Sequence, residues 1–198
     1  MGELTYDALR DYRRRLGRQE TTIESEATHY TLAELASALR MTRGMLQAIA
    51  ADWTQEQLLI RPPFDATVAV GSDEDRWSAT EVITHLIATE NWYLLHMGRL
   101  IGQREHFDLM PRGLGDHARQ DVPQDELAPD LAAATERLLH FIASIPPDAD
   151  LTAQRDSTFF GNLSLRGWVL LAITHDLDHW TQIQRLSELP DFPRPLPQ

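Results

Sequence analysis

The chain has 198 residues, of which 18 are basic and 30 acidic, and its formal net charge is −12. It contains no cysteine, which excludes disulfides, iron–sulfur clusters, thiolate zinc sites and a cysteine nucleophile. A surface this acidic repels phosphate groups, so the chain is not expected to bind nucleic acids or an anionic membrane.

Residues 1–30 are predicted to be an N-terminal helical extension. Apolar positions recur at helical spacing from Leu4 to Gln19, between charged residues, as on a surface helix. This segment lacks the apolar stretch of a signal peptide, and no apolar run in the chain approaches the ~18 residues that a membrane span needs. We therefore expect a cytoplasmic protein with no membrane partner.

Capping boxes mark the next two helix starts. Thr31 and Glu34 form such a box before a helix that is expected to reach about Asp52. Thr54 and Gln57 are predicted to start one further turn, which a Pro-Pro pair ends.

The best-marked helix begins after Ser78, where Glu81 completes a third capping box, and its apolar pattern continues to Gly102. Residues 64–76, before this helix, are expected to form a loop or a short extended segment. Residues 103–124, after it, contain proline and glycine without sustained periodicity, and loops of this length are often functional.

Two more helices are predicted in the C-terminal half. One runs from Asp125 or Asp130 to about Ile145, and the last begins after Ser164 and continues to Leu189. The stretch between them is expected to be a loop. The sequence shows too little alternation of apolar and polar residues to predict a sheet.

Together these elements predict an all-α fold, a four-helix bundle with an additional N-terminal helix. The bundle is expected to span residues 31–190. Residues 191–198 are rich in proline and are expected to be an extended tail.

The last predicted helix carries two histidines, His175 and His179, four residues apart and therefore on one face. Two imidazoles at this spacing can bind one metal ion, as in the H-E-x-x-H motif. Asp176 follows the first histidine where that motif has glutamate, so the metalloprotease reading is excluded.

A third ligand should come from a facing helix, and His85 is the natural candidate because it lies among apolar residues of the capped helix. Gln182 follows His179 by one turn, and it can hydrogen-bond a ligand or a bound water. Asp178 and Asp176 are candidate acceptors for the N–H groups of the histidine rings.

Histidines also occur at this spacing by chance, and a single histidine on an apolar face is more often a hydrogen-bonded core residue. His96 lies eleven residues after His85 and returns to nearly the same helix face, so periodicity does not separate the two. His117 lies in the long loop, where a contact with substrate is plausible.

Two segments resemble motifs of the DinB-like/YfiT-like superfamily. The stretch from Trp77 to Leu86, WSATEVITHL, resembles W-S-x-x-E-v-l-x-H-L, and HDLDHWTQI, which begins at His175, is similar to H-x-x-x-H-x-x-Q-I. The resemblance covers roughly residues 31–189. It implies a four-helix bundle, often dimeric, in which three histidines hold a divalent metal.

Carried over position by position, the implied ligands are His85, His175 and His179. Members of the superfamily with known chemistry include S-transferases and isomerases that use bacillithiol or mycothiol. The resemblance therefore implies a homodimer in which a divalent metal supports transfer of a small-molecule thiol. Three imidazoles suit zinc, nickel or iron. We expect substrate to enter beside the loop at 108–120, where Arg112 or Arg119 can hold a carboxylate.

Three alternatives stay open at this point. A metal-bound hydroxide can hydrolyse esters or amides without a thiol. The chain can also be a non-catalytic helical dimer that binds a metal or a small ligand in a stress response. In the third alternative the histidines are core residues and the bundle is an assembly scaffold.

Overall fold

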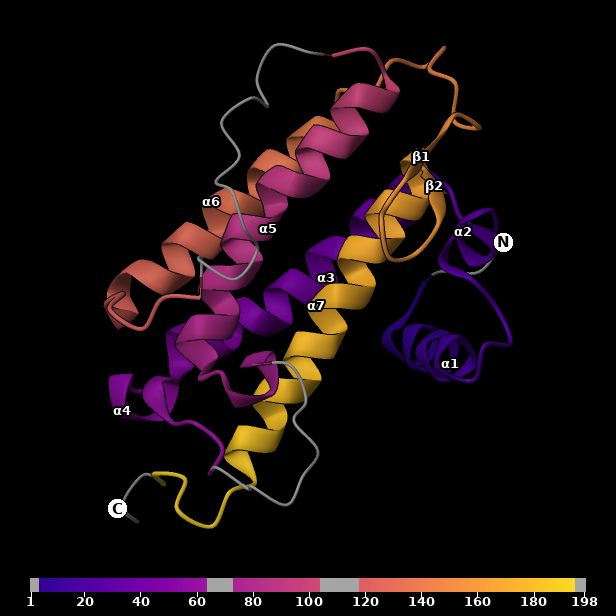
Figure 1. Cartoon of the computed structure of the whole chain (residues 1–198). Coiled ribbons are helices and arrows are strands. Elements are labelled where there is room, and N and C mark those ends of the chain that lie inside the picture. The colour runs from indigo at the N-terminus through magenta and orange to yellow at the C-terminus, as the bar shows by residue number, and fades with distance from the viewer. Residues whose placement is uncertain (1–3, 64–72, 104–117, 195–198) are drawn as a thin grey trace.

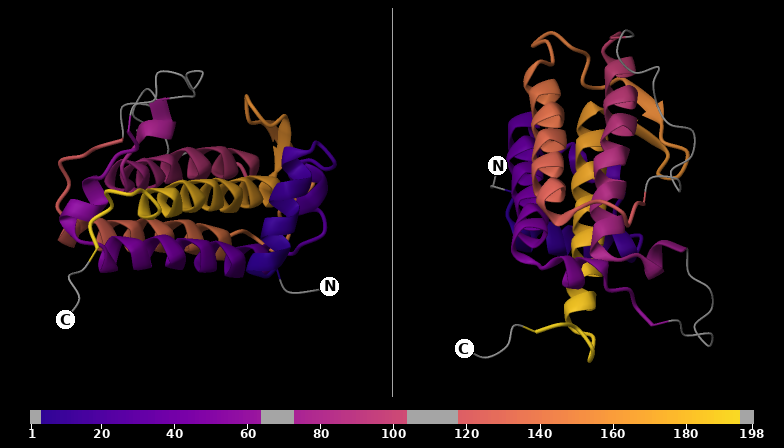
Figure 2. Two further views of the ribbon diagram at one scale, coloured as in Figure 1. Left: turned by 90° about the horizontal axis from the view of Figure 1, so that it is seen from below. Right: turned by 90° about the vertical axis from the view of Figure 1, so that its left-hand side faces the viewer.

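A computed structural model describes residues 4–63, 73–103 and 118–194, and its main feature is a set of four long helices (Figure 1). These helices are α3 (Leu32–Asp52), α5 (Ala79–Leu100), α6 (Gln124–Ala143) and α7 (Leu165–Ser187). Each of α3 and α5 packs against both α6 and α7. The four helices lie side by side as a bundle, which confirms the predicted all-α class (Figure 2).

The predicted capping boxes start their helices as expected. Thr31 and Ser78 each accept the backbone N–H of the glutamate three residues later, and that glutamate accepts the backbone N–H of the capping residue. Thr54 does the same with Gln57 at the start of the short helix α4 (Gln55–Leu59). Ser164 caps α7 by accepting a backbone N–H. Local chemistry therefore sets where these helices begin.

The N-terminal extension contains two helices in place of the one predicted, α1 (Tyr6–Gly17) and the short α2 (Ile23–Ala27). The sequence analysis missed α2 because five residues are too few to show helical periodicity. Tyr6 of α1 packs edge-on against Trp180 of α7, and Arg13 of α1 pairs with Asp178 of α7. These contacts fix the extension against the bundle.

A small antiparallel hairpin lies in the stretch that was expected to be a loop. Its strands are β1 (Gln154–Asp156) and β2 (Asn162–Ser164). Strands of three residues are too short for an alternating pattern to be recognised, which is why the sequence did not predict them. Thr158 and Gly161 in the connecting turn have positive φ angles of 72° and 73°. The turn places two phenylalanines beside the bundle.

The buried core consists of two apolar clusters with a polar layer between them. One cluster centres on Trp168 and the other on Leu86. Along the four long helices, buried polar residues separate the two clusters. They are Thr42, Arg43, His85, Thr89, Glu90, Thr135, Thr174, Asp176 and His179. The candidate site therefore lies in a polar belt across the middle of the bundle.

The first residues of the proline-rich tail contact the bundle. Phe192 packs edge-on against Trp53 with ring centroids 4.9 Å apart, and the side chain of Gln57 donates to the carbonyl of Pro193 at 2.7 Å. Among the described helices, none combines the length and the apolar character that crossing a membrane requires.

Candidate metal centre

Three histidine side chains from two helices converge in the polar belt. His85 comes from α5, and His175 and His179 come from α7. The Nε2 atom of His175 lies 3.2 Å from Nε2 of His85 and 3.0 Å from Nε2 of His179. His85 and His179 are 3% and 5% exposed, so water has little access to two of the rings. The structure brings together all three histidines that the sequence singled out.

This spacing suits ligands of one metal ion. Nitrogens bound to a tetrahedral zinc ion at ~2.0–2.1 Å lie about 3.3 Å apart, close to the distances between these Nε2 atoms. Burial and the two neighbouring imidazoles hold the pKa of His175 well below its usual value. Burial also lowers the pKa of His179. Both rings are therefore neutral near pH 7, which is the form that binds metals.

Gln182 orients one of the rings. Its side-chain oxygen lies 2.8 Å from Nδ1 of His179, so Nδ1 carries the proton and Nε2 presents a lone pair to the cluster. The amide nitrogen of Gln182 donates to the backbone carbonyl of Glu74, which holds the amide in this orientation. On the same side, the ring of Trp77 stacks over His179 and contacts His85. Gln182 therefore has the position expected of a residue that supports a metal ligand.

The two aspartates beside the histidines have other partners. The carboxylate of Asp178 pairs with Arg13 of α1. Asp176 is fully buried, and its Oδ2 accepts from Nε of Arg43 at 2.8 Å and from Oγ1 of Thr42 at 3.1 Å. In the described part of the chain these carboxylates accept hydrogen bonds from Arg13, Thr42 and Arg43, so their proposed support of the histidine ligands is indirect.

Arg43 is the site neighbour that the sequence analysis did not single out. It lies between Leu39 and Leu46 on the apolar stripe of α3, where a charged residue is costly unless it is paired. An arginine on an apolar stripe is a sequence signal for a buried ion pair, but it does not identify Asp176 as the partner.

His96 lies apart from the cluster. Its ring stacks on Trp168 with centroids 4.4 Å apart, and its Nδ1 accepts from Nε of Arg155 at 3.2 Å. Burial, together with the nearby charge of Arg155, lowers the pKa of His96 to about 4. His96 is thus a packed, neutral histidine that lies beside Trp168, away from the three clustered histidines.

The loop residues predicted to contact substrate are only partly described. Arg112 and His117 lie outside the described residues. The guanidinium of Arg119 is exposed and pairs with Asp121 at 3.0 Å. The backbone N–H of Arg119 donates to Oγ1 of Thr84 at 2.9 Å, so this segment is fixed to α5 one residue before His85.

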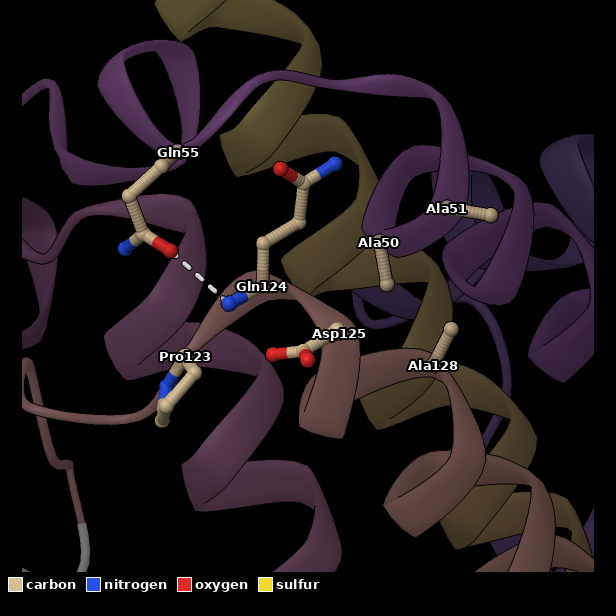
Figure 3. Close-up of a pocket in the computed structure, with 7 residues that line it drawn as sticks. All are labelled: Ala50, Ala51, Gln55, Pro123, Gln124, Asp125 and Ala128. Carbon is tan, nitrogen blue, oxygen red and sulfur yellow. Dashed lines mark hydrogen bonds between the residues drawn. The ribbon is translucent and has the colours of Figure 1, made fainter.

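A pocket of about 390 Å³ opens beside the cluster, and His85 and His175 form part of its lining. A second pocket, of about 520 Å³, lies where α6 begins, and there Gln55 accepts the backbone N–H of Gln124 at 2.8 Å (Figure 3). Its described lining is mainly alanine, glutamine and proline and contains no histidine. Of these two pockets, the one beside the imidazoles therefore adjoins the candidate metal ligands.

A helical bundle with three converging imidazoles defines a class of protein with a centre suited to a divalent metal. Comparison with family models assigns the family: the model of the DinB superfamily matches residues 38–183, and the chain belongs to this superfamily. The matched segment contains all three histidines, and it confirms the resemblance seen in the sequence motifs. No curated protein matches the chain.

Proposed function

We propose that the protein is a divalent-metal-dependent enzyme in which His85, His175 and His179 are the metal ligands. The observation that carries the proposal is the convergence of the three rings, with Nε2 of His175 within 3.2 Å of its two neighbours. Three imidazole nitrogens suit zinc, nickel or iron. In this assignment Gln182 fixes the tautomer of His179, and Trp77 restricts the motion of two of the rings.

The activity that we propose is transfer of a small-molecule thiol to an acceptor. When bound, a divalent ion would stabilise the thiolate form of the cosubstrate, which is the nucleophilic form. In the overall reaction a carbon–sulfur bond forms, the bond to the leaving group breaks, and the thiol proton is released to solvent. Two features support this activity: the chain has no cysteine to compete for the metal, and a pocket beside the imidazoles can hold an acceptor.

The metal assignment is tested by elemental analysis of protein purified without a histidine tag. We expect a stoichiometric divalent ion in the parent protein and in His140→Ala, which changes an exposed histidine of α6. The His175→Ala variant should lose the ion. An ion-free parent that binds no added zinc, nickel or iron, or a His175→Ala variant that binds metal like the parent, would contradict the assignment.

The reaction type is tested by omitting the thiol. Conversion of electrophilic acceptors should require both the metal and an added low-molecular-weight thiol. Metal-dependent turnover of esters or amides without a thiol would indicate a hydrolase instead. Light scattering on the same preparations tests the homodimer that we propose.

A further inference from the structure

The pocket beside the histidines has walls made largely of apolar and aromatic side chains. Its apolar lining comes from α1, α5, the β1–β2 turn and α7. The residues are Leu16, Trp92, Tyr93, Phe159, Phe160 and Leu171. A volume of about 390 Å³ is in the range of small-molecule sites, which are usually apolar with a few polar groups.

Two of these residues are exposed to an unusual degree. Phe159 and Phe160 in the hairpin turn are 74% and 51% exposed. The turn is held in place, because the N–H of Ser157 donates to the carbonyl of Gly161 at 2.9 Å and the N–H of Phe160 donates to Oγ of Ser157 at 2.8 Å. A fixed turn thus presents two aromatic rings to water at the rim of the pocket, where a bound apolar molecule would cover them.

The charged groups of the pocket are acidic. Glu74 and Asp178 line it together with the two histidines, and its described lining contains no arginine. Arg13 neutralises Asp178 from α1, whereas Glu74 is an exposed acidic residue of the lining. In the metal-free protein these carboxylates, with a net charge of −12 for the whole chain, disfavour anions in the pocket, whereas a divalent ion on the two histidines would add positive charge to its wall.

We propose that this pocket binds a small aromatic molecule, with its ring against Phe159 and Phe160, and that the metal-free protein prefers such a molecule without a negative charge. In the proposed enzyme this molecule is the acceptor of the thiol. Only this assignment as acceptor rests on the proposed function. Binding itself follows from the lining and is independent of turnover.

The charge preference is tested with three ligands that share one ring system: 1-naphthylmethylamine, 1-naphthalenemethanol and 1-naphthoate. Calorimetry on the chelator-treated protein should show that the amine and the alcohol bind at least about ten-fold more tightly than the carboxylate. The titrations are made with metal-loaded and with chelator-treated protein, so that direct binding of naphthoate to a metal is recognised. Equal or tighter binding of naphthoate to the chelator-treated protein would overturn the proposal.

The location is tested at the hairpin turn. Phe159→Ser and Phe160→Ser should each weaken binding of the alcohol by about five-fold, because each removes one aromatic contact. Leu59→Ser changes an apolar residue of α4 that is 40% exposed and does not line the pocket, so it should leave binding unchanged. Both phenylalanine variants should keep the parent's metal content and thermal stability. Unchanged binding in both would overturn the proposal.

The contribution of Glu74 is tested by Glu74→Gln, with Asp75→Asn as a matched control in the same short helix, η1 (Asp73–Arg76). Glu74→Gln should reduce the preference for the amine over naphthoate, and Asp75→Asn should not. Selective binding of the amine and alcohol without any turnover would contradict the proposed function and leave this inference standing. Thiol transfer to anionic acceptors, without selective binding of the non-anionic ligands, would do the reverse.

Discussion

Arg43 and Asp176 form an ion pair in the centre of the bundle, with Nε of Arg43 2.8 Å from Oδ2 of Asp176 and side chains that are 1% and 0% exposed. The pair joins α3 to α7 one residue after His175, so it fixes the rotation of α7 about its axis. That rotation directs His175 and His179 toward α5. The fold and the candidate metal centre therefore depend on the same buried contact.

Breaking this pair should be much more costly than replacing it. Arg43→Met leaves a carboxylate buried without its partner, and we expect it to lower the free energy of unfolding by about 3–5 kcal/mol. The double variant Arg43→Met/Asp176→Leu removes both charges of the pair, so it should be less destabilised than the sum of the two single variants. Urea unfolding of chelator-treated proteins measures the four free energies. Additivity within about 0.5 kcal/mol would show that the two side chains are not coupled.

Removal of the metal should destabilise the protein, because an ion that binds only the folded state stabilises it by mass action. At a free metal concentration about 100 times Kd the stabilisation is about 2.7 kcal/mol, which corresponds to a fall in Tm of about 5–10 °C on chelation for a chain of this length. Differential scanning calorimetry with and without a chelator measures the change. His175→Ala should show no such difference, whereas His140→Ala should behave like the parent. Equal Tm values for the parent protein in both conditions, after metal loading, would argue for a structural role of the histidines.

Helix starts and the pair of histidines on α7 could be predicted from the sequence because both depend on residues three or four positions apart. Ser78 with Glu81, and His175 with His179, are examples of such local patterns. The hairpin could not be predicted in this way, since its strands have only three residues each.

Helical periodicity alone does not show which of His85 and His96 is the third candidate ligand. Both lie on nearly the same face of α5, but eleven residues separate them by about 16 Å along the helix axis. Because α5 runs antiparallel to α7, His85 is level with His175, whereas His96 is level with Trp168. Only the family motif or the structure shows which residues of α5 and α7 lie at the same level of the bundle. The pairing of Arg43 with Asp176 has the same cause, since it joins residues 133 positions apart.

Gln182 should tune metal affinity without being a ligand. Gln182→Ala removes the acceptor that holds Nδ1–H of His179, and loss of such a partner typically weakens metal binding about 10–100-fold. Gln182→Glu restores an acceptor at the same position and should recover most of the affinity. Competition with a chromophoric chelator measures Kd, with Gln184→Ala on the same helix as the control. If Gln182→Ala binds metal as tightly as Gln184→Ala, the amide does not support the ligand.

Glu90 is another buried ionisable residue of the polar belt. It lies on α5 with no exposed side-chain surface, and its Oε1 accepts from Nε of Arg137 at 2.9 Å. Burial raises the pKa of Glu90 to about 7, against the opposing effect of the positive charges of Arg137 and Arg43. Near neutral pH the folded protein therefore holds a proton that the unfolded chain, with an ordinary glutamate pKa, has released.

This difference predicts how stability depends on pH. Between pH 4.5 and about 7 the folded state binds the proton of Glu90 and the unfolded state does not, so this group's contribution to stability falls as pH rises through that window. A shift of this size corresponds to at most about 3 kcal/mol. Glu90→Gln should therefore be more stable than the parent at pH 8, and the advantage should shrink toward pH 5. Urea unfolding of chelator-treated protein at several pH values measures it, with the exposed Glu136→Gln on α6 as control. A constant difference between Glu90→Gln and the parent across this range would show that Glu90 ionises in the folded protein as it does in the unfolded chain.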